Sequence, residues 1–331
     1  MYVDHPKFGN WIGTSGFANM EDSIPIRKNS IFNLASITKT YTSVVAMEMI
    51  KSGQLNLDDH IELYLPNDII MGIPNATKIK IRNLLNMSSG IYSYEHNPDL
   101  VSQYLADSFR FQQMSHLDII KKYVLGKKAY FDPGQGYQYS TTNYLLIGMI
   151  LENISKKDLG QLYEEYIFSK LGLKQTFLHH GFEESSLVNF YADLDQEGTH
   201  ENVSDKEMDI YRWTLGDSGI FATAEETGKF MEALCTDKLL SEKYVDLMTE
   251  WIPADDPKYG FGLDYSKGFP YKSLMGHDGV GLGSYSMAYY FPNQEITVVL
   301  LTNTGISQSG KKYKKILSRL IKKASLKLFL F

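Results

Sequence analysis

The sequence predicts a mixed α/β fold in which both ends of the chain build one antiparallel sheet that is flanked by helices. Segments rich in β-branched and aromatic residues, which are typical of strands, lie near the two ends. The long middle part shows helical spacing of apolar residues and many turns. We therefore expect a discontinuous α/β sheet domain of residues 1–60 and 253–331, with residues 61–252 inserted as a mainly helical lobe. A cleft between two such lobes is a common place for a small-molecule site.

The N-terminal part supplies two expected strands and one long helix. Residues 1–18 have the pattern of strand, turn and strand, with the turn at 7–10. A short apolar run at 31–34 leads directly into Ser36, and apolar residues then recur at spacings of three and four until Gly53 supplies a stop. Because apolar residues and alanine cover most of this helix, we expect it to be buried on nearly all sides.

The rest of the chain changes from helices to strands. Helices are expected at 81–85, at 144–154, at 162–171, and from Thr223 to Leu234 behind a capping box in which Glu226 reaches back to the cap. Strands are expected at 259–264, 284–291 and 295–302, and the last two form a hairpin around the turn at 292–293.

Composition argues against several classes of protein. Of the 331 residues 43% are hydrophobic and the net charge is -6, so nothing favours a nucleic-acid partner. The single cysteine, Cys235, allows no internal disulfide and is expected to be a small core residue. The chain has no apolar run that would suit a transmembrane helix, and residues 1–13 do not have the pattern of a signal peptide, so the localisation stays open. We expect no metal, because the eight histidines are scattered and H-E-x-x-H is absent. A monomer without a cofactor is expected as well.

The last 21 residues carry a concentration of positive charge. Apolar residues recur there at helical spacing, which predicts a basic amphipathic helix. Such a helix usually packs its apolar stripe on the sheet, and weak contact with an anionic membrane surface is the alternative. The basic residues are Lys311, Lys312, Lys314, Lys315, Arg319, Lys322, Lys323 and Lys327.

Ser36 and Lys39 form an S-x-x-K motif at the start of the buried helix. Positions i and i+3 share one face of a helix, so the hydroxyl and the ammonium should meet over one turn. A serine needs a base to become a nucleophile, and burial lowers the pKa of a lysine so that it can serve as that base. Unpaired N–H groups at the helix N-terminus favour a developing oxyanion. A second match, Ser309 to Lys312, has no apolar helix to desolvate its lysine and is interpreted as a helix cap.

Two further segments fit this chemistry. Tyr139 follows a turn at 132–134 and precedes an apolar helix; beside a lysine its pKa could be drawn down and it could shuttle protons, although an ordinary aromatic residue at a helix start is the plain alternative. Residues 276–283 form a glycine-rich segment before a strand, where an N–H group could complete an oxyanion hole.

The order of these segments resembles the penicillin-binding-protein and serine β-lactamase superfamily, in particular class C β-lactamases and low-molecular-weight D,D-peptidases. The resemblance runs from about Trp11 to Thr304 and implies a β-lactamase/transpeptidase-like fold. It is carried by F-N-L-A-S-I-T-K at 32–39, G-Q-L-N-L-D-D at 53–59, Y-L-P at 64–66, I-R-N-L-L at 81–85, S-S-G at 88–90, the stretch from P-G at 133–134 to Gly148, L-G-L at 171–173, G-I-F-A-T at 219–223 and H-D-G at 277–279.

The resemblance implies a covalent acyl-enzyme mechanism without a cofactor. Ser36 would be the nucleophile, with Lys39 and Tyr139 as its activating pair, and His277 would stand at the lysine position of the family's K-T-G triplet. The N–H groups of Ser36 and Val280 would form the oxyanion hole. Which member of the lysine–tyrosine pair acts as base stays open.

Departures from the family pattern indicate the substrate. Thr141 replaces the asparagine of Y-x-N, and Asp278 replaces the hydroxyl residue that meets a substrate carboxylate beside Gly279. An aspartate there would repel a carboxylate and attract an amine. We therefore expect an esterase or D-aminoacyl hydrolase acting on small-molecule, peptidoglycan-type or teichoic-type substrates. A D-alanyl-D-alanine carboxypeptidase or weak β-lactamase is the alternative, and a non-catalytic cell-wall binding protein is the alternative from another class.

Overall fold

A computed structural model describes residues 1–106, 114–179, 186–211, 213–252, 258–268 and 271–305. The expected basic C-terminal helix, with its membrane alternative, lies outside these residues. No helix in the described part of the chain is long and apolar enough to cross a membrane.

The main sheet has seven strands and joins the two ends of the chain. Its strand order is β10-β11-β12-β13-β14-β1-β2, and every neighbouring pair is antiparallel. β1 pairs with β14 through Tyr2 opposite Val299, which confirms that both termini build one sheet. The strands are β1 (Tyr2–His5), β2 (Gly9–Ile12), β10 (Lys258–Tyr259), β11 (Asp264–Gly268), β12 (Tyr271–Val280), β13 (Tyr285–Phe291) and β14 (Ile296–Thr302).

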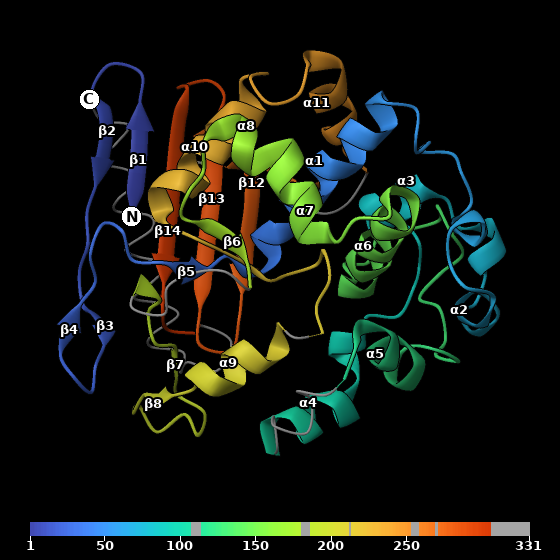
Figure 1. Cartoon of the computed structure of the whole chain (residues 1–331), viewed down its shortest axis with the longest axis horizontal. Helices are drawn as coiled ribbons and strands as arrows, with labels where there is room; N and C mark the ends of the chain where they lie inside the picture. The colour runs from blue at the N-terminus through green and yellow to red at the C-terminus, as the bar shows by residue number, and fades with distance from the viewer. Residues whose placement is uncertain (107–113, 180–185, 212, 253–257, 269–270, 306–331) are drawn as a thin grey trace.

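Helices and three smaller sheets form the rest of the molecule, and α1 lies between the main sheet and the helices α3 and α6 (Figure 1). Helix α10 packs on β13, β14 and β1, whereas α3 and α6 pack together on the far side of α1. The helices are α1 (Thr38–Lys51), α2 (Asn67–Gly72), α3 (Ile81–Leu85), α4 (Pro98–Ala106), α5 (His116–Tyr123), α6 (Thr141–Ser155), α7 (Leu159–Tyr163), α8 (Ser169–Leu171), α9 (Ser204–Ile210), α10 (Ala224–Cys235) and α11 (Glu242–Met248).

Helix α1 is the centre of the main core, as its composition predicts. Its residues from Thr38 to Met49 are all buried, and they belong to the sequence segment that also carries the serine motif. Burying so many polar side chains along with the apolar ones requires hydrogen bonds, and the structure supplies them: Thr40 donates to the Gly262 carbonyl at 2.6 Å, and Ser43 bonds the Tyr144 hydroxyl at 2.9 Å.

A three-stranded sheet outside the main one was not predicted. It has the order β5-β9-β6 and consists of β5 (Phe32–Asn33), β9 (Ile220–Ala222) and β6 (Thr176–Leu178). Strand β5 leads directly into the serine motif, so this small sheet fixes the entry of the chain into the site. Two short hairpins complete the strands: β3 (Phe17–Asn19) with β4 (Ile24–Pro25), and β7 (Tyr191–Ala192) with β8 (Glu201–Asn202).

Several expected elements have different bounds. The strand expected at 259–264 is wrong, because the chain turns between β10 and β11, where Gly262 has a φ of +69°. The helix expected at 162–171 is divided into the end of α7, a π-helical segment (Glu164–Phe168) and α8. The glycine-rich segment 276–283 does precede a strand, β13, but its residues 276–280 also form the end of β12.

The capping box expected before α10 is half correct. Thr223 caps the helix by accepting from the Glu226 N–H at 3.3 Å. The Glu226 carboxylate instead turns away and accepts from the N–H groups of Lys174 and Gln175 and from the Thr176 hydroxyl, at 2.7–2.8 Å. It therefore fastens β6 to α10, a tertiary role that local sequence does not reveal.

Candidate active site

Ser36 lies in a tight 3₁₀ turn (Ala35–Ile37) between β5 and α1. The preceding residue, Ala35, has a φ of +46°, a left-handed conformation that costs a non-glycine residue free energy. The Asn33 side chain holds this turn by accepting from the Ala35 N–H at 2.8 Å. The strained turn presents Ser36 at the N-terminal end of α1, where backbone N–H groups lack helical partners.

Lys39 reaches back to Ser36 as the S-x-x-K spacing predicts. Its Nζ atom donates to Ser36 Oγ at 2.9 Å and to the Asp217 carbonyl at 2.8 Å. The side chain is completely buried, and this burial lowers its pKa, against a smaller opposing effect of Asp217 and other nearby carboxylates. A larger fraction of Lys39 is therefore neutral than for a surface lysine, which is the condition for accepting a proton from serine.

Tyr139 joins Ser36 and Lys39 as the third member of the predicted group. Its hydroxyl hydrogen-bonds Ser36, and Lys39 Nζ lies 5.2 Å from the centre of its ring. The expectation that the lysine draws down the pKa of this tyrosine is wrong, because burial raises the pKa well above its usual value and the bond to Ser36 lowers it by less. Tyr139 is therefore a neutral hydroxyl, which can donate and relay a proton.

His277 stands behind Tyr139 and is neutral. Its Nδ1 bonds the Asp278 carbonyl at 2.5 Å, so Nδ1 carries the hydrogen, and Nε2 accepts from the Tyr259 hydroxyl at 3.1 Å. Burial and then the charge of Lys39 lower its pKa to about 3. His277 packs against the ring of Tyr139, with 6.2 Å between ring centres.

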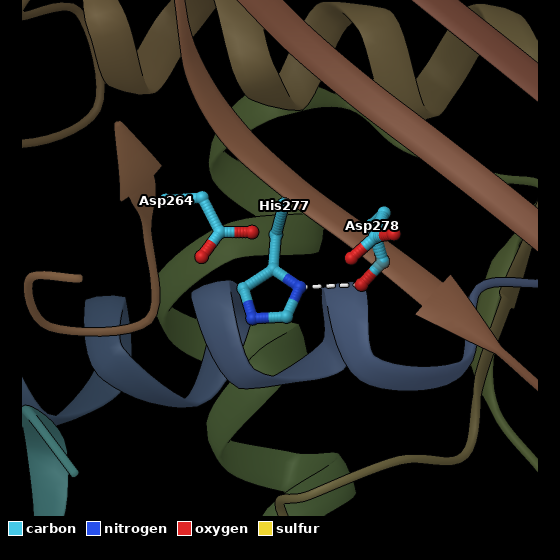
Figure 2. A group of neighbouring side chains, drawn as sticks. All are labelled: Asp264, His277 and Asp278. Atoms are coloured by element: carbon cyan, nitrogen blue, oxygen red, sulfur yellow. Dashed lines mark hydrogen bonds between the residues drawn. The ribbon is translucent and has the colours of Figure 1, made fainter. Parts of the chain in front are cut away.

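Two carboxylates flank the imidazole (Figure 2). Asp264, which the sequence analysis missed, and Asp278 come from neighbouring strands on either side of the ring, and the ring itself points toward α1. Burial, and then the nearby charge of Asp278, raise the pKa of Asp264 to about 7. The pKa of Asp278 is raised by burial as well. Two acids so close favour sharing a proton or attracting a cation.

This cluster of Asp264, His277 and Asp278 is where a metal would find ligands among the described residues. Ligand atoms of the three residues lie within 4.8 Å of one another. Both ring nitrogens of His277 are already engaged, however, by the Asp278 carbonyl and by Tyr259. A metal would have to break one of these bonds, so the arrangement fits a metal poorly.

A cavity of about 400 Å³ opens beside Ser36. Ser36, Lys39, Thr141 and Val280 line it, whereas Tyr139, His277, Asp278 and Gly279 do not. Its remaining wall is mostly apolar and aromatic and comes largely from α4, α9 and the residues after them. These residues are Tyr94, Glu95, Leu100, Val101, Tyr104, Leu105, Ile210, Tyr211, Trp213, Thr214, Asp217, Ser218, Gly281 and Leu282.

Two acidic residues of this wall carried no sequence signal. The Glu95 carboxylate accepts from the Thr141 hydroxyl at 2.6 Å, so the residue at the family's asparagine position holds an acid in place. Asp217 accepts from the Tyr94 hydroxyl at 2.5 Å and from the Leu215 N–H at 2.8 Å. Its pKa is raised to about 6 by burial, against the opposing charge of Lys39.

Gly279 brings β12 against the turn at 34–37 that holds Ser36, which we name the nucleophile turn after the expected role of Ser36. A Cβ atom on this residue would lie 2.3 Å from the Leu34 carbonyl oxygen and 2.9 Å from the Ser36 nitrogen. Only a glycine permits this approach. The next residue, Val280, is therefore held beside Ser36, as a shared oxyanion hole requires.

Comparison with known proteins gives a consistent result. The family model described as Beta-lactamase matches residues 6–321. Penicillin-binding protein 4* of Bacillus subtilis (strain 168) is 25% identical over an alignment of 285 positions, and the match covers 78% of this chain and 60% of that protein. The chain thus spans less than two thirds of the length of this relative.

Solved structures of the same fold cover nearly the whole chain. A D-stereospecific amidohydrolase from Streptomyces sp. superposes with a TM-score of 0.79 at 25% identity, covering 93% of this chain and 90% of that one. The D-amino acid amidase from Ochrobactrum anthropi SV3, complexed with D-phenylalanine, gives a TM-score of 0.79 at 20% identity and covers 98% of this chain and 93% of that one. The second likeness shows the fold alone.

Proposed function

The chain belongs to the Beta-lactamase family, and on this premise we propose that it is a serine acyl-hydrolase of small amides and esters that carry a free amino group. Membership supports hydrolysis of amide or ester bonds, and the serine mechanism and the substrate are the proposal. The observation that carries it is the 2.9 Å bond between Ser36 Oγ and the buried Lys39 Nζ, whose pKa is lowered.

The proposed reaction has two halves. Neutral Lys39 takes the proton of Ser36 as Oγ attacks the substrate carbonyl, and the oxyanion forms between the N–H groups of Ser36 and Val280. The Tyr139 hydroxyl, bonded to Ser36, passes a proton to the leaving amine or alcohol as the carbonyl bond to it breaks, and Tyr139 recovers the proton that Lys39 took from Ser36. Water then attacks the acyl carbonyl and gives a proton to the Lys39–Tyr139 pair. As the bond to Oγ breaks, the pair returns that proton to Oγ, which releases the acid and regenerates Ser36.

The charge of the cavity supports an amine-bearing substrate. Among the described lining residues the charged ones are Lys39, Glu95 and Asp217, and Lys39 is committed to Ser36. Glu95 is exposed to the cavity and is therefore the group we propose for the substrate ammonium. The apolar wall would take an apolar side chain, and the names of the similar amidohydrolase and amidase favour a D-amino acid amide.

The carboxyl pair argues against substrates with a free carboxylate. Neither Asp264 nor Asp278 lines the cavity, but both act electrostatically on Lys39 beside Ser36, and negative charge on them would disfavour a penicillin or a peptide ending in D-alanine. The D-alanyl-D-alanine carboxypeptidase and weak β-lactamase alternatives are therefore less favoured than an amidase or esterase.

Intact-protein mass spectrometry tests the chemistry. Wild type and Ser36→Ala are incubated separately with a fluorophosphonate, benzylpenicillin and D-phenylalanine amide. We expect a Ser36-dependent fluorophosphonate adduct and Ser36-dependent hydrolysis of the amide, without a stable penicilloyl adduct. A stable penicilloyl adduct would favour the peptidase alternative, and the lack of any Ser36-dependent reaction would favour a non-catalytic binding protein.

A specificity variant tests the substrate. Glu95→Gln should raise KM for D-phenylalanine amide about 10-fold or more, because a charge-assisted hydrogen bond is replaced by a neutral one. An ester of N-acetyl-D-phenylalanine, which has no ammonium, should be unaffected. Glu62→Gln, an exposed acid outside the cavity wall, is the matched control. Equal effects of Glu95→Gln on both substrates would refute the assignment.

A further inference from the structure

A fully buried carboxylate on α9 links the two backbone segments that provide the proposed oxyanion hole. Glu207 has no exposed surface, and its Oε1 atom accepts from Asn33 Nδ2 at 2.8 Å, from Ser284 Oγ at 2.7 Å and from the Tyr211 hydroxyl at 3.1 Å. Its Oε2 atom accepts from the Gly283 N–H at 2.9 Å. A buried carboxylate with four donors is well compensated, and replacing it leaves buried donors without their acceptor.

The first segment that Glu207 holds is the nucleophile turn. Asn33 uses its Nδ2 group for Glu207 and its Oδ1 atom for the Ala35 N–H at 2.8 Å. Ala35 is the residue with the left-handed φ that precedes Ser36. The Asn33 amide therefore transmits the position of the Glu207 carboxylate to the strained turn and to the Ser36 N–H.

The second segment is the turn between β12 and β13. Gly281 and Ser284 close this turn through a backbone bond of 3.0 Å, while Gly283 and Ser284 donate to Glu207. A Cβ atom on Gly281 would lie 2.2 Å from Glu207 Oε1, so the turn packs directly on the carboxylate. Val280, the other proposed donor, immediately precedes this turn.

We propose that Glu207 is a positioning residue that sets the spacing of the Ser36 and Val280 N–H groups. It touches no substrate and takes no proton; it holds two turns that are about 250 positions apart in sequence at one fixed separation. This inference rests on the proposed acyl-enzyme chemistry at Ser36. Since oxyanion stabilisation acts on the transition state, loss of Glu207 should lower the rate of acylation more than binding.

The test is the saturation kinetics of fluorophosphonate labelling of Ser36 for wild type, Glu207→Gln and Glu226→Gln. Glu226 is the matched control, because it is a buried carboxylate with three donors at 2.7–2.8 Å that fastens β6 to α10 and does not line the cavity. We expect Glu207→Gln to lower the maximal labelling rate about 10- to 100-fold with a nearly unchanged half-saturation concentration. This is less than the rate loss of about 10²- to 10³-fold that removal of a whole oxyanion donor causes, because the donors are displaced and not removed. Glu226→Gln should lose stability but keep its labelling rate.

The pH profile separates positioning from general loosening. Glu207→Gln should lower the labelling rate equally at every pH, because Lys39 remains buried, whereas a loosened site would move the profile toward that of an ordinary lysine. If Glu207→Gln does not fold, Ser284→Ala removes one donor only and should lower the rate several-fold. If Glu207→Gln labels within 2-fold of the wild-type rate, or if its pH profile is shifted, the positioning role of Glu207 is overturned while the proposed function stands. A wild type that never labels would overturn the proposed function and this inference with it.

Discussion

Replacing Gly279 with alanine should separate the two sides of the proposed oxyanion hole. The new Cβ atom would lie 2.3 Å from the Leu34 carbonyl oxygen, 2.5 Å from Ser286 Oγ and 2.9 Å from the Ser36 nitrogen. Two of these three neighbours are backbone atoms of the nucleophile turn, which cannot rotate away. The strand or the turn must therefore move.

The required movement follows from the distances. An ordinary contact between carbon and oxygen begins near 3.4 Å, so the 2.3 Å approach requires β12 and the Ser36 turn to separate by about 1 Å. Misplacement of that size costs about 10²-fold in rate where groups must be aligned. Overpacking also costs about 1–3 kcal/mol of stability. We expect kcat to fall about 100-fold with a modest loss of stability.

A matched substitution distinguishes the local effect from the loss of stability. Gly228→Ala would place a Cβ atom 2.2 Å from the Tyr2 ring, where α10 meets β1, and Gly228 does not line the cavity. Initial rates of ester hydrolysis and urea denaturation are measured for wild type and both variants. Gly228→Ala should lose stability but keep kcat. The reasoning is refuted if Gly279→Ala keeps kcat within 3-fold of wild type, or if both variants lose activity in proportion to stability.

Three further substitutions test the electrostatics of the site. Lys39→Met should abolish labelling of Ser36. In wild type the free energy of unfolding should rise with pH between the lowered folded pKa of Lys39 and its unfolded value of 10.5, because the folded protein binds fewer protons there, and Lys39→Met should remove this rise. Urea denaturation at pH 7 and 9 measures the rise, and an equal rise in the variant would contradict the burial argument. Asp264 has a folded pKa of about 7 against 3.8 unfolded, so stability should fall as pH rises from about 4 to 7, and Asp264→Asn should flatten that fall by a few kcal/mol at most; an equally steep fall in the variant would point to other groups. Tyr259→Phe leaves His277 Nε2 without its donor and should cost about 1–3 kcal/mol, whereas an unchanged midpoint of denaturation would show that the bond contributes little.

Local pattern was sufficient for the elements whose signal lies in consecutive residues. The apolar spacing of α1, the hairpin of β13 and β14 and the Thr223 cap are confirmed, because periodicity and capping act within a few positions. The S-x-x-K spacing likewise required Lys39 to meet Ser36, since one helical turn fixes both side chains. The strand expected at 259–264 failed because a left-handed glycine breaks it.

The sequence by itself predicted the pairing of Ser36 with Lys39, the antiparallel sheet from both termini and the family resemblance, because each of these depends on short spacings or on ordered motifs. Only the tertiary structure decided the pKa values of these groups and the residues that surround them. Burial raises the pKa of Tyr139 where the presence of a lysine suggested the opposite, and Asp264 and Glu95 join the site from segments without a motif. Glu207 is the clearest case, since three of its four donors come from two segments that are distant in sequence, at Asn33 and at Gly283 and Ser284. Desolvation and long-range hydrogen bonding depend on which segments the fold brings together, and no local pattern records that.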